Sequence, residues 1–188
     1  MKTLDLVKMA MYLALFTVLD LLATNLPIFK MPNGGSLGLA TVVLMLAAFD
    51  LGWKKGLLVS LLSIVMQQFV GEIYLIRIDQ VFFDYVLAFG IYGLAPLLTL
   101  VPKNKDGRVP VLGLVISSVI VNCVRFASHV FVGATLWLVH LPQAERWGAS
   151  FAYSSSYMIP TIIYGAIMLP ILYLALWPAF KRQKEKTS

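Results

Sequence analysis

The sequence predicts an all-α integral membrane protein, a six-transmembrane-helix bundle, on three observations. Hydrophobic residues make up 60% of the 188-residue chain and charged residues only 13%, whereas a soluble domain carries about 25% charged residues. The apolar residues gather into six runs that are separated by polar or Gly- and Pro-rich connectors. Finally, six spans place the connectors alternately on the two sides of the membrane, and most of the basic residues then fall on one side.

Each run predicts one span of a single transmembrane domain that covers residues 1–188. A bilayer core needs about 20 apolar residues per helix, and Pro27 closes the first run before a Gly-rich loop. The second run is the shortest, and the fifth exceeds one bilayer thickness, so we expect it to tilt or protrude. The expected spans are residues 7–26, 37–49, 56–70, 80–101, 110–141 and 151–180.

The distribution of positive charge predicts the orientation. With six spans, one side of the membrane holds eleven of the fifteen basic residues, namely Lys2, Lys8, Lys54, Lys55, Lys103, Lys105, Arg108, Lys181, Arg182, Lys184 and Lys186. The opposite side holds Lys30, Arg77 and Arg146. Excess Lys and Arg mark the cytoplasmic side, so both termini are expected in the cytoplasm, in a multi-pass protein of the bacterial cytoplasmic membrane. Because the net charge of +6 is dispersed in this way, no nucleic-acid partner is expected.

The sequence lacks the motifs of several function classes. A single cysteine, Cys123, excludes an intrachain disulfide. No His-Glu-x-x-His, Gly-x-Ser-x-Gly or Walker-type phosphate loop is present, and His129 and His140 have no nearby carboxylate pair to complete a metal site. We therefore expect no enzyme activity, no metal and no cofactor. Any ATP hydrolysis that powers the protein must belong to another chain.

Four ionisable residues fall within the expected spans: Asp20, Asp84, Arg125 and His129. Such residues usually face a bundle interior or a cavity, and Asp84 and His129 have similar outer depth. Trp137 follows His129 by about two turns on a similar face. A carboxylate, an imidazole and an indole around one cavity suit a small, planar, nitrogen-bearing ligand, and the rings also suit a cation. Further aromatic residues at this level are Tyr74, Tyr85, Trp147, Tyr153 and Tyr157.

Each of these residues also has an interpretation without a ligand. Asp84 and Arg125 are equally suited to a structural ion pair, and Asp20 to hydrogen bonding within the bundle. Trp147 and Tyr157 fit an interfacial aromatic belt. On the first span, Ala10 and Ala14 are four residues apart, which allows a neighbouring helix to approach closely. Two interpretations fit this pair equally well: ordinary packing inside the bundle, or contact with a partner helix.

Four stretches of the sequence carry a resemblance to a known family: Met31–Ser36, Asp79–Gly90, Arg125–Trp137 and Tyr153–Pro160. Over nearly its whole length, the chain resembles the substrate-binding S components of energy-coupling factor (ECF) vitamin transporters, most closely the thiamine-specific branch. The resemblance implies a substrate-binding subunit that captures thiamine at the extracellular face. It also implies two kinds of partner, a transmembrane coupling subunit and two ATPase subunits that use the ATP.

The resemblance also assigns roles to individual residues. Asp84 would hold the aminopyrimidine of thiamine, and Ala10 and Ala14 would dock on the coupling subunit. The full set of expected substrate-binding residues is Asp84, His129, Trp137, Tyr85, Arg125, Tyr74, Tyr153, Ser154 and Gly34, the last in a loop that would act as a lid.

The chain departs from the family pattern at two positions of the sixth span. Ala149 replaces a tyrosine, and Ser154 replaces an asparagine, so contacts to the ligand are lost. A pyridoxine-type vitamin or a hydroxymethylpyrimidine is therefore an alternative ligand. A stand-alone proton-coupled carrier with Asp84, Arg125 and His129 as a relay is an alternative function.

Overall fold

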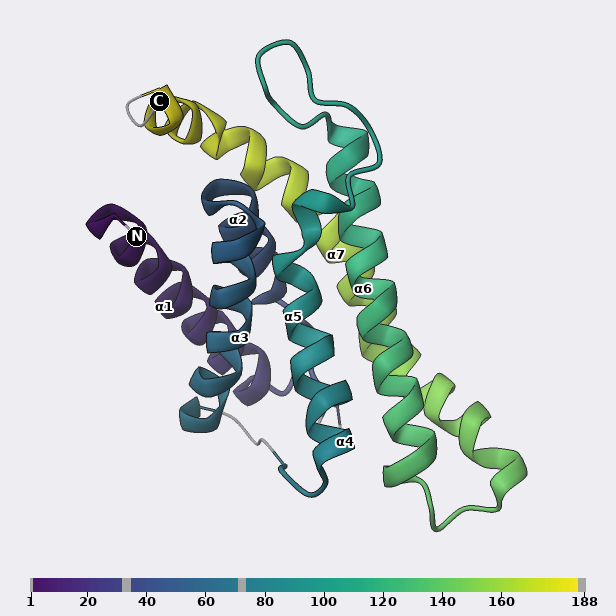
Figure 1. Cartoon of the computed structure of the whole chain (residues 1–188). Helices are drawn as coiled ribbons and strands as arrows, with labels where there is room; N and C mark the ends of the chain where they lie inside the picture. Colours follow the sequence, from purple (N-terminus) through teal and green to yellow (C-terminus); the bar gives the residue numbers. More distant parts are fainter. Residues whose placement is uncertain (1, 32–34, 71–73, 186–188) are drawn as a thin grey trace.

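The structure is a computed structural model that describes residues 2–31, 35–70 and 74–185. Within these residues all regular secondary structure is helical (Figure 1), apart from one isolated bridge between Lys30 and Ser36. Six helical segments follow one another along the chain, which confirms the predicted all-α class.

Three of the six segments are single helices at the start of the chain: α1 (Thr3–Asn25), α2 (Thr41–Leu51) and α3 (Trp53–Val70). The fourth is composite, with α4 (Ile78–Val81), the π-helical η1 (Phe82–Leu87), α5 (Ala88–Gly93) and the 3-10 turn η2 (Ala95–Leu97). The fifth runs through α6 (Val111–Val132) into the π-helical η3 (Gly133–Trp137), and the last is α7 (Gln143–Glu185).

The ends of the helices differ from the expected spans for physical reasons. α7 begins at Gln143, before the expected start at residue 151. Its first turns carry Glu145 and Arg146, which are helical but too polar to belong to an apolar run, so hydropathy did not include them. The fourth segment ends at Leu97, whereas the expected span ends at residue 101. Three residues after Leu97, Leu100 adopts a positive φ of 52°, which is not helical. Hydropathy thus predicts that each helical segment exists, but it does not predict the helical turns at the ends that contain polar residues.

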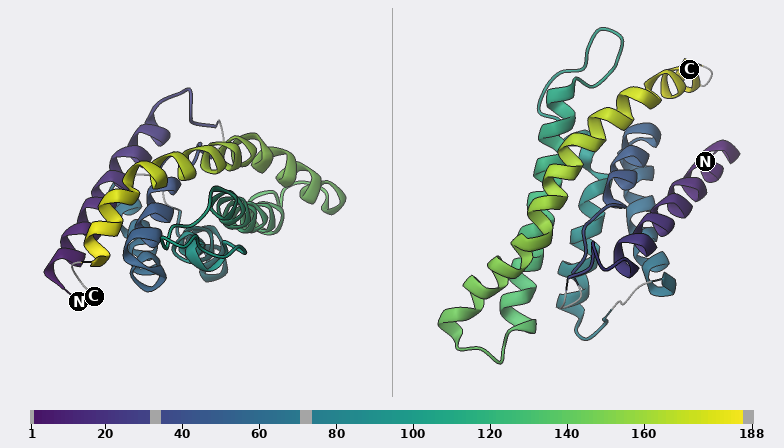
Figure 2. Two further views of the ribbon diagram at one scale, coloured as in Figure 1. Left: turned by 90° about the horizontal axis from the view of Figure 1, so that it is seen from above. Right: turned by 180° about the vertical axis from the view of Figure 1, so that it is seen from behind.

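Within the described residues, three segments are long and apolar enough to cross a membrane by themselves, namely Thr3–Asn25, Val111–Trp137 and Gln143–Arg182. At a rise of about 1.5 Å per residue, α7 far exceeds the roughly 30 Å thickness of a bilayer core. α7 also contains Pro160, Pro170 and Pro178, and a proline inside a helix removes a backbone hydrogen bond and bends it. Figure 2 shows α7 curving along the bundle.

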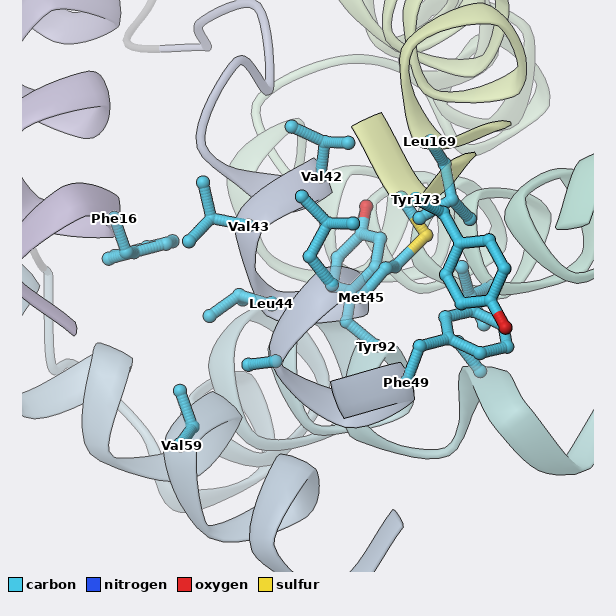
Figure 3. Close-up of a cluster of buried hydrophobic side chains, with 14 of the residues drawn as sticks. Phe16, Val42, Val43, Leu44, Met45, Phe49, Val59, Tyr92, Leu169 and Tyr173 are labelled. Carbon is cyan, nitrogen blue, oxygen red and sulfur yellow. The ribbon is translucent and has the colours of Figure 1, made fainter. Parts of the chain in front are cut away.

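Helix α2 lies at the centre of the bundle. Its residues from Thr41 to Phe49 are all buried, and it packs against α1, α3, α5 and α7. Figure 3 shows Val42, Val43 and Met45 of α2 among side chains that come from the surrounding helices. A helix that is apolar on every side is stable only when it is enclosed. This explains why so short a run is helical.

Glycines bring the backbones around α2 into close contact. A Cβ atom on Gly93 would lie 2.3 Å from Cα of Leu57, and one on Gly56 would lie 2.4 Å from Cβ of Ala48. α3 therefore packs directly on both α2 and α5, as small residues allow in membrane bundles. Between α2 and α3, Gly52 adopts a φ of 85°, which favours glycine and makes the connection a single-residue turn.

Both termini lie at one end of the bundle, together with the α2–α3 and α5–α6 connections (Figure 1). The α1–α2 and α6–α7 connections lie at the opposite end. This arrangement is the one that six spans require. The orientation of the two ends across a membrane stays a prediction.

Candidate substrate-binding site

Asp84 lies in the π-helical segment η1, and its side chain is the hub of a buried hydrogen-bond network. Gln80 Nε2 donates to Oδ2 of Asp84 over 3.1 Å, and Trp137 Nε1 approaches the same oxygen at 3.4 Å. Nδ1 of His129 lies 3.1 Å from Oδ1. Asp84 is only 9% exposed. π-Helical segments occur frequently at functional sites because they re-aim side chains, and here both η1 and η3 supply site residues.

The tautomer of His129 follows from its second partner. Arg125 Nε donates to Nε2 of His129 over 3.1 Å. A guanidinium group has donors but no acceptor, so Nε2 must be unprotonated and the ring proton must reside on Nδ1, facing Asp84. The result is a directed chain of hydrogen bonds from Arg125 through His129 to Asp84.

Arg125 is buried, and aromatic rings surround its charge. Its guanidinium carbon lies 4.5 Å from the centre of the Phe89 ring and 5.9 Å from that of Tyr92. Nη1 also donates to the Tyr92 hydroxyl over 3.5 Å, and this hydroxyl donates to Asn122 over 2.7 Å. Cation–π contacts gain strength when they are desolvated. His129 bonds both Arg125 and Asp84, so the two charges are joined through the imidazole instead of forming the direct ion pair considered above.

Aromatic side chains form the outer rim of the site. Trp137 of η3 is 41% exposed, and the Tyr74 ring meets it edge-on with centroids 6.1 Å apart. The backbone N–H of Tyr74 donates to the Tyr85 hydroxyl over 3.1 Å. The structure thus brings Tyr74, Tyr85 and Trp137 to the same rim, as the sequence predicted.

Helix α7 closes the other side of the site with two tyrosines whose rings meet edge to face. Tyr157 packs edge-on against His129 with centroids 6.0 Å apart, and Tyr153 packs against Tyr157 at 5.8 Å. Tyr157 is buried, so its interpretation as an interfacial belt residue is wrong. Ser154 of the same helix is also buried.

The α1–α2 connection is tied to α7 directly over these tyrosines. The N–H of Gly35 donates to the Tyr153 hydroxyl over 3.0 Å, and the N–H of Gly38 donates to Thr161 Oγ1 over 2.9 Å. A Cβ atom on Gly35 would lie 2.8 Å from the Tyr157 ring, and one on Gly38 would lie 3.3 Å from Nη1 of Arg125. Only glycine allows this approach. Gly34, the predicted lid residue, lies outside the described residues.

Three residues that shape the site are not among the predicted substrate-binding residues: Gln80, Tyr92 and Tyr157. Gln80 precedes Asp84 by four residues and therefore shares its face of a helix, which was an available signal. Tyr157 was named only as an aromatic residue at the same depth, and Tyr92 carried no signal beyond being aromatic. Among the other candidates, Asp20 is half-buried on α1. Ala10 and Ala14 are exposed on α1, so the alternative of packing inside the bundle is wrong for them.

The arrangement suits recognition rather than bond breaking. Asp84 presents a carboxylate whose orientation is fixed by three nitrogen atoms, and such a group accepts hydrogen bonds from a ring amine. Trp137, Tyr74 and the α7 tyrosines offer faces and edges to a planar or cationic ring. Aromatic walls with a few fixed polar groups are typical of small-molecule sites.

Comparison with known proteins identifies the family of the chain. Residues 6–181 match the model of the thiamine transporter protein family, Thia_YuaJ. The thiamine transporter ThiT of Bacillus subtilis (strain 168) is 28% identical over 176 residues, which cover 90% of each chain. A solved structure of ThiT from Listeria monocytogenes has the same fold, with a TM-score of 0.68 at 18% identity over 95% of this chain and 97% of that one. Because the family model spans nearly the whole sequence, the protein is a transporter and not an enzyme, and the chain belongs to the thiamine transporter protein family.

Proposed function

We propose that this chain is the S component of an ECF-type importer and that it captures thiamine at the extracellular face of the cell membrane. Its family membership supports thiamine as the substrate. The position of Asp84 and Trp137 in the half of the bundle away from both termini supports an outward-facing site. The chain itself holds no cofactor in this proposal, because the ATP is used by partner subunits.

The fixed carboxylate of Asp84 is the observation that carries the proposal. The aminopyrimidine ring of thiamine bears an exocyclic amine that donates to Oδ1 or Oδ2 of Asp84. Its thiazolium ring is a cation, and it lies against the Trp137 and Tyr74 rings, where cation–π attraction contributes about 0.5–2 kcal/mol. His129 and Gln80 hold the carboxylate in place before the ligand arrives, which lowers the entropic cost of binding.

The α1–α2 connection acts as the lid in this proposal. Its bonds from Gly35 to Tyr153 and from Gly38 to Thr161 hold it closed over the site, and ligand entry requires that they break. Each such bond contributes about 0.5–1.5 kcal/mol net, so opening the lid is a low-cost motion.

The exposed face of α1 is the docking surface for the transmembrane coupling subunit. Ala10 and Ala14 are both exposed there, and the absence of a large side chain at these positions lets a partner helix approach closely. Two ATPase subunits bound to the coupling subunit then power release of thiamine to the cytoplasm.

Titration of the purified chain with thiamine, in detergent and without partners, tests the site. Calorimetry reports binding, and so does the tryptophan fluorescence of the protein, to which Trp137 is one of four contributors. Asp84→Asn is expected to weaken binding at least about tenfold, because a hydrogen bond to a charged group contributes about 1.5–3 kcal/mol. Asp79→Asn is the matched control, since Asp79 is exposed and bonded to Arg77. Unchanged binding by Asp84→Asn contradicts the site assignment.

The ligand's identity is tested separately, because Ser154 is shorter than the asparagine that the resemblance leads us to expect. Competition among thiamine, hydroxymethylpyrimidine and pyridoxine ranks the three compounds. Native mass spectrometry of the purified chain identifies any compound that co-purifies. Tighter binding of either alternative than of thiamine would reassign the substrate while leaving the site intact.

A stand-alone proton-coupled carrier is the second candidate function. The observation in its favour is the continuous hydrogen-bond chain Arg125–His129–Asp84, since proton relays in transporters use such chains. Uptake by vesicles that contain this chain alone, driven by a pH gradient, supports the carrier. Uptake that requires the coupling subunit and ATPases supports the S component.

A further inference from the structure

A cavity of about 770 Å³ opens at the end of the bundle that carries both termini. Its walls come from the start of α1, the α2–α3 turn, η2, the α5–α6 connection and the C-terminal half of α7. No residue of the candidate substrate site lines it. The cavity is therefore a separate feature, and the inference drawn from it does not rest on the proposed function.

The inner wall of this cavity is apolar. Phe49, Tyr173 and Phe180 line it and are buried, and their rings pack on one another, with centroids 5.5 Å apart for Phe49 and Tyr173 and 6.0 Å apart for Tyr173 and Phe180. Leu97 lines the cavity and is exposed. Such a surface suits hydrocarbon better than a soluble polar ligand.

The mouth of the cavity carries unbalanced positive charge. Lys2, Lys55 and Lys103 line it together with Asp5 and Asp50. Lys55 bonds Asp5 over 2.7 Å and Lys8 bonds Asp50 over 2.6 Å, so each carboxylate already has a lysine. In the described part of the chain Lys103 has no ion pair or hydrogen bond. An anion from outside the chain would complete this arrangement.

The neighbouring side chains place the mouth at the level of lipid headgroups. Trp53 lines the cavity and is 39% exposed, and Lys54 Nζ lies 5.5 Å from the centre of its ring. Tryptophan is enriched at membrane–water interfaces, and lysine extends its ammonium group toward water there. An apolar wall below this level and ammonium groups at it match the two parts of a phospholipid.

We propose that this cavity binds an anionic phospholipid, with its phosphate at Lys103 and Lys2 and an acyl chain along Leu97 and Phe180. Charge complementarity favours an anionic over a zwitterionic headgroup. The apolar wall favours a lipid over free phosphate. A bilayer supplies such lipids continuously, and each lysine near an anionic headgroup strengthens binding by about fivefold.

Native mass spectrometry of the full purified chain tests the proposal, with phosphatidylglycerol and phosphatidylcholine of identical chains as probes. We expect higher occupancy by phosphatidylglycerol and a larger rise in thermal stability with it. Lys103→Gln is expected to weaken phosphatidylglycerol binding about fivefold. Lys105→Gln is the matched control because Lys105 lies in the same connection but does not line the cavity. Helicity and gel-filtration profile confirm that both variants fold.

Three kinds of result would overturn the proposal. The first is a failure of charge selectivity, seen as equal occupancy by the two lipids or as an equal effect of the two lysine variants. The second is stabilisation by inorganic phosphate alone at the same molar concentration, which would indicate a free-anion site. The third is unchanged lipid binding by Lys103→Gln together with loss of a co-purifying protein, which would indicate a protein interface.

Discussion

His129 donates its Nδ1–H to the carboxylate of Asp84 across 3.1 Å. The bond has this direction because Arg125 already donates to the other ring nitrogen. An imidazole used in this way is a spacer with one donor and one acceptor at fixed positions. It separates a buried cation from a buried anion while it bonds to both, and it leaves the second carboxylate oxygen to Gln80, Trp137 and a ligand.

Replacing His129 tests this spacer role. His129→Ala removes both bonds and leaves buried charges less well satisfied, so thiamine binding is expected to weaken by about tenfold or more. His129→Asn places an amide N–H near the former Nδ1 and should retain part of the affinity. Calorimetric titration measures both constants. Equal affinities for the wild type and His129→Ala would show that the ring does not organise the site.

The lid can be tested through Gly38. A Cβ atom there would lie 2.8 Å from Cγ2 of Thr161, so Gly38→Ala is expected to displace the α1–α2 connection and break its bond to Thr161. Overpacking of this kind costs about 1–3 kcal/mol, which corresponds to roughly 5- to 150-fold weaker thiamine binding. Gly148→Ala is the control, because nothing lies within 4 Å of its Cβ position. Similar affinities for the two variants would argue against the lid.

The close approach of α3 and α5 predicts a difference between two glycines of one helix. Gly93→Ala forces a methyl group toward the Leu57 backbone 2.3 Å away, whereas Gly90→Ala meets its nearest atom at 3.5 Å. We expect Gly93→Ala to lower thermal stability by about 2–10 °C. Gly90→Ala should change it little or raise it. Thermal unfolding in detergent measures both, and the opposite order would contradict the packing described.

If the coupling subunit docks on α1, a variant of that surface should lose thiamine uptake while it keeps thiamine binding. Ala10→Leu combined with Ala14→Leu enlarges an exposed surface, so thiamine binding by the purified chain should be unchanged. Uptake by cells should fall at least about tenfold, because a partner helix can no longer approach closely. Leu15→Met, also exposed on α1 but about 100° around the helix from Ala14, should leave both unchanged. Normal uptake by the double variant would place the docking surface elsewhere.

Bilayer thickness imposes long apolar runs, so the sequence was sufficient to predict the six helical segments. Ionisable residues inside such runs are rare, so they could be selected as candidate site residues. The depth that topology assigns to Asp84 and His129 was sufficient to predict that they meet. Their hydrogen bond with each other and the rim position of Trp137 follow that expectation.

The remaining features depend on geometry that the sequence does not encode locally. A π-helical turn at η1 leaves no compositional trace, yet it sets the direction in which Asp84 points. Tyr157 is indistinguishable in sequence from an interfacial tyrosine, and only its ring contacts with His129 and Tyr153 show that it faces inward. Hydropathy likewise misses the start of α7, since Glu145 and Arg146 form helix outside the apolar core.

The enclosed helix α2 has a consequence for how the protein is made. Eleven residues span only about 16 Å, too short for a nascent segment to partition stably into lipid on leaving the ribosome. The single-residue turn at Gly52 joins it to α3, so the two segments are expected to leave the translocon together as a hairpin. The helix that packs against α1, α3, α5 and α7 is thus the one that depends most on its neighbours to reach the membrane.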